Sequence, residues 1–412
     1  MISELGKKAR KASLVLSSAS DEQKNAALVK AAETIRNRQD IILVENAKDI
    51  ENAKAKDYPS AFIDRLLLTE KRIADISDGI IKITSLEDPV GIILEENIRP
   101  NGLKIVKKTV PLGVIGVIFE SRPNVSADSA ALCIKSGNAV ILRGGKEAIN
   151  SNAAIVGAIR DAISEAGLPS DCVQIIEDTT RASATELMHA DGYIDVLIPR
   201  GGPGLIKAIK KEASVPVIET GAGTCHTYIN YDADIDMAVD IVVNAKTSRP
   251  SVCNALECLL VNERIADKAL PRIYDALKQK GVVIRGDEKA KDILPEIESA
   301  TEDDWGYEYD DLILALRTVS STDEAISYIN EYGTNHSDCI ITEDPTEAEM
   351  FMQKVDSAAV YWNASTRFTD GGEFGFGAEI GISTQKLHAR GPLGLKELCS
   401  YKYLIYGKGQ IR

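Results

Sequence analysis

Residues 113–143 read GVIGVIFESRPNVSADSAALCIKSGNAVILR, and this stretch decides the fold. It begins and ends with apolar runs, residues 113–119 and 139–143, in which polar residues do not alternate with apolar ones. Between the runs, residues 126–135 form a segment expected to be helical. Continuous apolar strands that alternate with helices are typical of a parallel sheet covered on both faces.

The same rhythm of strand and helix continues along the chain, and a second cycle starts near residue 226. We therefore predict an α/β protein with two doubly wound parallel-sheet domains. Further strands are expected at VQII, VLIP, VPVI, HTYI, ALECLLV, VVIR, DLILALRTV, DCIIT and AAVYW, and further helices at 148–166, 181–189, 263–280, 323–332 and 345–355.

The first 110 residues have a different texture. Apolar positions at three-to-four spacing predict helices within residues 21–56 and 61–83. Residues 91–110 predict a β-hairpin with its turn at Pro100-Asn101-Gly102. Such a ribbon is either an oligomerisation arm or a plain surface hairpin.

Composition excludes several classes of protein. The 48 lysines and arginines against 62 aspartates and glutamates give a net charge of −14, which argues against nucleic acid or an anionic membrane as partner. No secretory signal and no run of about 18 apolar residues is present. The seven cysteines show no CxxC spacing and the four histidines no HxxxH spacing, so we expect reduced thiols, a cytoplasmic protein and no metal site.

Two glycine-rich turns could hold a nucleotide, although the chain has no GxGxxG motif. VILRGGKEAINSN (140–152) and VLIPRGGPGLIKAI (196–209) each join a strand to the start of a helix. Backbone N–H groups at a helix N-terminus favour phosphate, and Arg143, Lys146 or Arg200 would add positive charge. Glycine also serves such turns for steric reasons alone, and that alternative stays open.

The segment SRPSVCNAL (248–256) places Cys253 at the mouth of an apolar strand. A cysteine within a strand is usually a small core residue. Here Lys246, Arg249 and Asn254 are its neighbours, and positive charge stabilises the reactive thiolate form. Cys253 is therefore a candidate nucleophile.

Four long blocks of the sequence form a distinctive set: FESRPNVSADSAALCIKSGNAVILRGGKEA, NAKTSRPSVCNALECLLV, VYWNASTRFTDGGEFGFGAEIGISTQKLHARGPLGL and SYKYLIYGKGQIR. The first of them resembles the cofactor-binding half of the aldehyde dehydrogenase superfamily. The set as a whole resembles the glutamate-5-semialdehyde dehydrogenases, also called γ-glutamyl phosphate reductases, over nearly the whole chain.

The resemblance implies NADPH-dependent reduction of L-glutamyl 5-phosphate to L-glutamate 5-semialdehyde and phosphate, the second step of proline biosynthesis from glutamate. Cys253 would form the thioester. Asn124 would donate to the oxyanion together with the Cys253 backbone N–H; the alternative for Asn124 is a turn residue after proline.

The cofactor site carried over by the resemblance is NADP(H)-binding. Arg143 would contact the 2′-phosphate with Lys146 as helper, and Gly201 and Gly202 would let the backbone approach the pyrophosphate. Glu308 would hold the nicotinamide ribose, with an exposed acid of an acidic loop as its alternative.

The substrate needs cations beside its carboxylate or phosphate and acids beside its amine. Four residues of the matched blocks are candidates, without assignment among them. Glu219 stays open between a proton shuttle and a local N-cap, and His388 between an acid or base and a structural residue. The four candidates are Arg122, Arg249, Arg367 and Asp370.

The resemblance also sets the organisation. We expect a homo-oligomer, dimer or tetramer, in which the C-terminal tail meets the hairpin and adds a strand to a partner's sheet; a frayed tail is the alternative. Functional association with glutamate 5-kinase is a further expectation. The expected parts are a cofactor-binding domain (1–90 and 111–225), a catalytic domain (226–385) and an oligomerisation hairpin and tail (91–110 and 386–412).

Two rival functions come from other classes. An NAD-linked enzyme that oxidises another aldehyde to an acid would need Glu219 as a working general base. A scaffold without catalysis would be expected to lack Cys253 or Asn124, and both are present.

Overall fold

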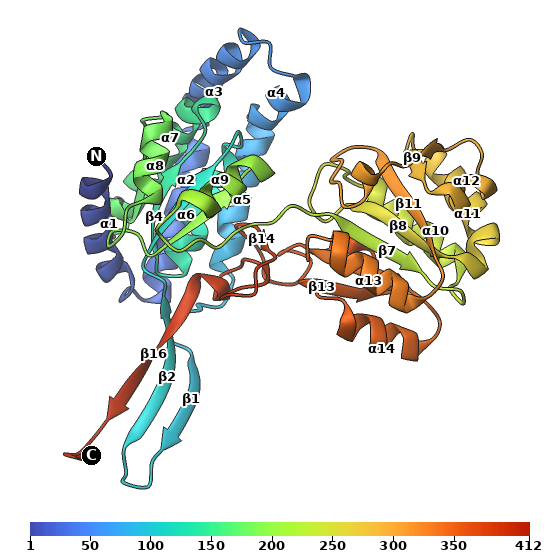
Figure 1. The fold of residues 1–412 in the computed structure, drawn as a ribbon. Coiled ribbons are helices and arrows are strands. Elements are labelled where there is room, and N and C mark those ends of the chain that lie inside the picture. The colour runs from blue at the N-terminus through green and yellow to red at the C-terminus, as the bar shows by residue number, and fades with distance from the viewer. The chain divides into compact units, whose positions relative to one another are not determined.

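The computed structural model describes the backbone of residues 1–412 and every side chain except those of Ala61 and Pro203. Its chain divides into two compact units, shown as a ribbon in Figure 1. The chain passes from the first unit to the second at Thr220–Gly221, five residues before the boundary expected from the sequence at 225/226. The first unit comprises Met1–Thr220, Gly375–Gly381 and Leu393–Arg412, and the second Gly221–Phe374 and Ile382–Pro392.

The first unit is built on a four-stranded parallel sheet in the order β5-β4-β3-β6. Residues 113–143 form the centre of this sheet, because all six residues of β3 are buried and β3 pairs with both β4 and β6. The helix between them, α6, is buried along most of its length. The elements are β3 (Val114–Phe119), α6 (Asn124–Lys135), β4 (Ala139–Arg143), α7 (Ile149–Glu165), β5 (Val173–Ile175), α8 (Arg181–Met188), β6 (Val196–Arg200) and α9 (Pro203–Glu212).

The helices before the sheet differ from expectation in two ways. The regions 21–56 and 61–83 are each broken into two helices, at Arg38 and at 67–69, and an additional helix, α1, covers Ile2–Leu16. Small residues such as Gly6 and Ala9 dominate the buried face of α1, so its apolar periodicity is weak.

Residues 215–218, expected as a strand, contribute a single bridge between Leu197 and Val217. The helices are α1, α2 (Asp21–Asn37), α3 (Gln39–Lys54), α4 (Ser60–Leu66) and α5 (Glu70–Thr84).

The hairpin and the tail form a separate three-stranded antiparallel sheet in the order β1-β2-β16, visible in Figure 1. We call these strands, β1 (Ile93–Ile98), β2 (Lys104–Pro111) and β16 (Cys399–Tyr406), the arm. The tail pairs with β2 over eight residues, from Cys399 opposite Pro111 to Tyr406 opposite Lys104. The expected meeting of tail and hairpin is thus confirmed within one chain.

The second unit is built on a seven-stranded parallel sheet in the order β10-β9-β11-β8-β7-β12-β13. Side-chain caps start its helices: Asn262 caps α11, Ser321 caps α13 and Asp344 caps α14. The elements are β7 (Cys225–Ile229), α10 (Ile235–Thr247), β8 (Leu256–Asn262), α11 (Glu263–Lys278), β9 (Val283–Gly286), α12 (Glu288–Ile293), β10 (Glu298–Ser299), β11 (Ile313–Val319), α13 (Thr322–Tyr332), β12 (Ser337–Ile341), α14 (Pro345–Lys354), β13 (Ala359–Trp362), β14 (Ile382–Ser383) and β15 (Gly391–Pro392).

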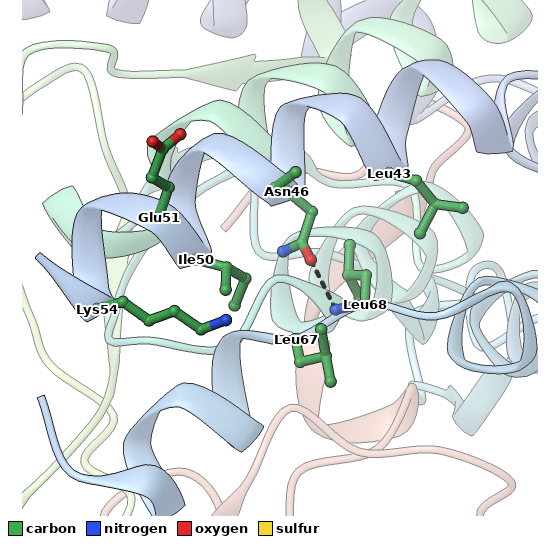
Figure 2. Close-up of a pocket in the computed structure, with 8 residues that line it drawn as sticks. Leu43, Asn46, Ile50, Glu51, Lys54, Leu67 and Leu68 are labelled. Carbon is green, nitrogen blue, oxygen red and sulfur yellow. Dashed lines mark hydrogen bonds between the residues drawn. The ribbon is translucent and has the colours of Figure 1, made fainter.

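A hollow of about 390 Å³ lies beside α3 and the residues that follow α4 (Figure 2). The side-chain amide of Asn46 in its wall is hydrogen-bonded within the fold. Its Nδ2 donates to the carbonyl of Leu66 and to Ser151 Oγ, and its Oδ1 accepts from the N–H of Leu68. The hollow is lined mainly by aliphatic side chains and holds none of the predicted site residues. In the described chain, no helix is both long and apolar enough to span a membrane.

Candidate active site

Cys253 lies in the turn that leads into β8, as expected of a nucleophile at the mouth of a strand. The structure describes all seven cysteines, and Cys253 is the one that is partly exposed while the other six are buried. Burial raises the pKa of Cys258 to about 12 and that of Cys225 well above its ordinary value. Those two thiols are therefore inert at neutral pH.

The backbone of Cys253 is held by the segment that precedes β7. A Cβ added at Gly223 would overlap the carbonyl of Cys253, so glycine alone fits there. The Sγ of Cys225 donates to the same carbonyl at 3.2 Å. The N–H of Gly223 in turn donates to Glu308 Oε1 at 2.8 Å. A single glycine thus connects the nucleophile loop to Glu308.

These groups share one edge of the seven-stranded sheet. Gly223, Cys253 and Glu308 each precede a strand, and the three strands β7, β8 and β11 run parallel as neighbours. They therefore lie at the amino edge of the sheet. Ligands of open α/β sheets usually bind at the carboxyl edge, so the loops here make the site and the strand order alone does not indicate it.

A second loop, residues 365–370, is hydrogen-bonded to the loop that contains Cys253. The amide Nδ2 of Asn254 donates to the carbonyls of Arg367 and Thr369, at 3.3 and 2.9 Å. Arg367 donates through Nη1 to Asn254 Oδ1 and through Nε to Ser248 Oγ. Thr366 Oγ1 donates to the Asn254 carbonyl at 2.8 Å. The NASTRFTDGG block is therefore bonded to the residue directly after Cys253.

The charge around Cys253 comes from two guanidinium groups. Arg367 is half-buried, and its pKa is lowered by burial first and by the nearby positive charge of Arg249 second. Arg249 itself is exposed. Lys246, expected as a third cation, is fully buried and pairs with Glu257 at 2.7 Å. Its charge is compensated inside the fold.

Two further residues of the matched blocks lie in bends of the chain in this unit. Asp370 is exposed, and its Oδ1 accepts from the N–H groups of Gly372 and Glu373, so it caps its own turn. His388 has a positive φ of 71°, a backbone conformation that non-glycine residues seldom adopt. The structure brings Cys253, Arg249, Arg367, Asp370 and Glu308 into the second unit.

The remaining predicted residues belong to the first unit and follow strands of its sheet. The turn after β3 contains Ser121 with a φ of 42°, then Arg122, and leads to Asn124 at the start of α6. Asn124 is exposed, and its Nδ2 donates to Asp128 Oδ2 at 2.9 Å. The amide is thus oriented by a carboxylate one helical turn further on.

Arg143, at the end of β4, is largely engaged by the backbone. Its Nη2 donates to the carbonyls of Thr179 and Thr180 at 2.7 and 2.9 Å, and its Nη1 to that of Gly144 at 3.2 Å. Its Nε is buried and has no hydrogen-bond partner among the described residues. Lys146, three residues on, is exposed.

The turn at Gly201 and Gly202 leads into α9, and a carboxylate sits against it. Glu120 Oε2 accepts from the N–H of Gly202 at 2.9 Å, and a Cβ added at Gly201 would crowd the same carboxylate. Glu219 pairs with Lys210 at 2.9 Å. Its carboxylate is therefore shared with a cation.

These features fit a dinucleotide. The two glycine turns lie at the carboxyl edge of the four-stranded sheet, because they follow β4 and β6. Arg143 Nε, without a partner among the described residues, and the exposed Lys146 supply donors there. Glu120 accepts from the Gly202 N–H and would have to release it before a phosphate could use that group. Among the described residues, no group of three or more His, Cys, Asp or Glu side chains could hold a metal ion.

Four residues that sequence analysis did not select are tied to the site. Gly223 lacks a local signal, since its partner Glu308 lies 85 residues further along the chain. Glu257 is the buried partner of Lys246, 11 residues before it. Asn254 was noted as a neighbour of Cys253 but not as the fastening of a second loop. Asp128 stands four residues after Asn124, and that helical spacing was a readable signal.

Comparison with known proteins gives a consistent result. The model of the aldehyde dehydrogenase family matches residues 2–305. A γ-glutamyl phosphate reductase of Clostridium perfringens is 61% identical over 407 residues, 99% of this chain and 98% of that protein. One of Carboxydothermus hydrogenoformans is 56% identical over 408 residues, 99% of this chain and 98% of that protein. The crystal structure of a γ-glutamyl phosphate reductase from Thermotoga maritima matches with a TM-score of 0.98 at 48% identity, covering 99% of both chains.

Proposed function

This chain belongs to the aldehyde dehydrogenase family, within it to the γ-glutamyl phosphate reductases, and from that premise we propose that it reduces L-glutamyl 5-phosphate with NADPH. The products are L-glutamate 5-semialdehyde and phosphate, and the step is the second of proline biosynthesis from glutamate. The observation that carries the proposal is the setting of Cys253, the one partly exposed thiol, fixed between Gly223 and the Asn254–Arg367 contact.

In the first half of the proposed reaction, the Cys253 thiolate attacks the acyl carbon of the substrate and phosphate leaves, so that a thioester forms. Arg367 favours the thiolate over the thiol, because its positive charge interacts with Cys253, and Arg249, four residues before Cys253, adds positive charge near Arg367. They are equally suited to the phosphate group as it departs. The oxyanion of each tetrahedral species is met by the Asn124 amide and the N–H of Cys253.

In the second half, NADPH when bound supplies the hydride that converts the thioester to a thiohemiacetal. This species collapses to the aldehyde and returns the thiolate. No activated water is needed, which agrees with the sharing of Glu219 with Lys210. Water must in fact be kept out, since hydrolysis of the thioester would waste the activated substrate.

The reverse reaction tests this proposal. L-Glutamate 5-semialdehyde, in equilibrium with its cyclic imine, should reduce NADP⁺ in a manner that depends strictly on inorganic phosphate. An NAD-linked aldehyde oxidation would proceed without phosphate and yield glutamate. Phosphate-independent turnover would overturn the proposal in favour of that rival.

Arg143→Ala should raise the KM for NADPH far more than the KM for NADH, because only NADPH carries the 2′-phosphate. We expect a difference of about tenfold or more, the range of one charge-assisted contact. Initial rates with both cofactors measure it. Because Arg143 also bonds three backbone carbonyls, a fall in melting temperature is expected with either outcome.

Lys146→Ala is the matched control for Arg143, since this exposed lysine lies three residues on in the same turn. Equal losses with NADPH and NADH in Arg143→Ala, together with a selective NADPH loss in Lys146→Ala, would transfer the 2′-phosphate contact to Lys146.

We propose further that the chain forms a homo-oligomer through the arm. Its strands leave large apolar side chains in solvent: Ile98 is 68% exposed, Ile405 61% and Tyr403 55%. Strands with such faces are unusual on a protein that remains alone. The functional association with glutamate 5-kinase remains a proposal as well, supported by the shared intermediate.

Truncation after Ser400 should convert the oligomer to monomer or aggregate, because it removes most of β16 from the arm. It retains Leu395 and Leu398, which are buried in the first unit, so the fold of that unit is spared. Light scattering measures the mass. A truncated chain of unchanged mass and activity would show that the tail has no part in assembly.

A further inference from the structure

Asp128 is a half-buried carboxylate beside the candidate oxyanion donor of the first unit. Asn124 begins α6 and Asp128 follows one turn later, so the two side chains share a face. They meet in a single hydrogen bond of 2.9 Å, from Asn124 Nδ2 to Asp128 Oδ2. The neighbours of Asp128 in the helix, Ala127 and Ser129, are buried.

The protein compensates this charge incompletely. Burial raises the pKa of Asp128 to about 6, although the Asn124 hydrogen bond and the positive charge of Arg200 act in the opposite direction. Among the described residues Asp128 makes no ion pair. A half-buried carboxylate with one neutral donor retains a desolvation cost that an arriving cation would offset.

Orientation of Asn124 does not by itself call for a carboxylate. A neutral acceptor, such as the amide oxygen of asparagine, would accept the same hydrogen bond without the cost of a buried charge. Asp128 also does not cap the helix, since α6 has no side-chain cap. The negative charge is therefore the unexplained property of this residue.

The proposed substrate carries a group of suitable chemistry, and this step rests on the proposed function. The substrate carries an α-ammonium whose nitrogen is separated from the reacting carbon by three carbon atoms, a span of about 5 Å when extended. If the Asn124 amide donates to the oxyanion, Asp128 is one further hydrogen bond away, and the span reaches it. Asp370, the other acidic candidate, has its Oδ1 engaged in its own turn.

We propose that Asp128 binds the α-ammonium of the substrate and makes the site selective for 2-amino acyl substrates over analogues that lack the amine. Asp128 is then a specificity-determining residue, and its hydrogen bond with Asn124 links recognition of the amine to the position of the oxyanion donor.

The test compares two aldehydes that differ in the amine alone, L-glutamate 5-semialdehyde and 5-oxopentanoate, in the phosphate-dependent reverse reaction. Asp128→Asn keeps a side-chain oxygen for Asn124 and removes the charge. We expect kcat/KM for the amino aldehyde to fall by about 10- to 100-fold, the range of a charged hydrogen bond, and kcat/KM for 5-oxopentanoate to stay within about twofold. Asp370→Asn tests the rival assignment: an unchanged ratio is expected, and a loss of the ratio in this variant but not in Asp128→Asn would overturn the proposal.

A second measurement is independent of turnover. Calorimetric binding of L-glutamate and of glutarate, which also differ in the amine alone, should favour L-glutamate in the wild type and lose that preference in Asp128→Asn. Equal losses for both aldehydes, or an unchanged preference for L-glutamate, would overturn the assignment. Absence of phosphate-dependent turnover in the wild type would instead refute the proposed function, and the binding preference would still decide the role of Asp128.

Discussion

Cys253→Ala should abolish phosphate-dependent turnover, with a loss on the order of 10⁴-fold or more, because no other group could form the thioester. The fold should survive, since the side chain is partly exposed and the contacts that fix this residue are made by its backbone. NADPH binding should stay close to that of the wild type. Initial rates, a thermal melt and calorimetric NADPH binding measure the three expectations.

Cys258→Ala is the control for this variant, because Cys258 is buried in β8 and its pKa is raised to about 12. It should lose about 1 kcal/mol of unfolding free energy and retain its activity. Turnover above a trace in Cys253→Ala, or loss of activity in Cys258→Ala without a loss of fold, would contradict the assignment of the nucleophile.

Lys246→Met should reduce the free energy of unfolding by about 3–5 kcal/mol, because it leaves the carboxyl of Glu257 buried without its partner. Both side chains of the pair are fully buried, with Nζ and Oε2 2.7 Å apart. Besides Lys246, a backbone hydrogen bond from Tyr309 stabilises the ionised Glu257 carboxyl. Denaturant unfolding of wild type and variant measures the difference.

The double variant Lys246→Met/Glu257→Leu separates the charge from the packing. Replacing both members of a buried pair by apolar groups is often nearly neutral, so the double variant should regain most of the loss. A double variant as unstable as Lys246→Met would show that packing, and not an unpaired charge, is the cause.

The pH dependence of the Lys246→Met effect follows from the carboxyl group. Burial raises the pKa of Glu257 from its ordinary value of 4.5 to about 7, so folding favours its protonated form. The stability that this group contributes is fully present below pH 4.5 and is lost as the pH rises through about 7. Without Lys246 the pKa rises further, so the destabilisation by Lys246→Met should be larger at pH 8 than at pH 5.

The sequence predicted the elements whose cause is local. The strands of the stretch 113–143 are continuous apolar runs, and they form the buried centre of the first sheet. The second cycle of strands and helices was predicted in the same way, and the long blocks led to the family. Helix α1 was missed because its buried face consists partly of Gly6, Ala9 and Ala12, which carry little apolar signal.

For the candidate site, the sequence alone selected Cys253 and the blocks around it. It did not indicate that Lys246 is a buried partner of Glu257. A lysine seven residues before a candidate nucleophile was interpreted as a cation near the thiol, because a lysine is seldom buried. The sequence also suggested a free guanidinium at Arg143, whereas the backbone carbonyls of Thr179 and Thr180 bind most of it.

What only the tertiary structure decided are the contacts between segments far apart in the chain. Gly223 meets Glu308 across 85 residues, and Asn254 meets the Thr369 carbonyl across 115. Periodicity and composition report which face of an element is buried, since burial depends on neighbours within a few residues. They do not report which buried groups face each other, because that depends on the order and register in which the strands assemble. The loop around Cys253 is held by such pairings, and the chain defines them only once the seven-stranded sheet has formed.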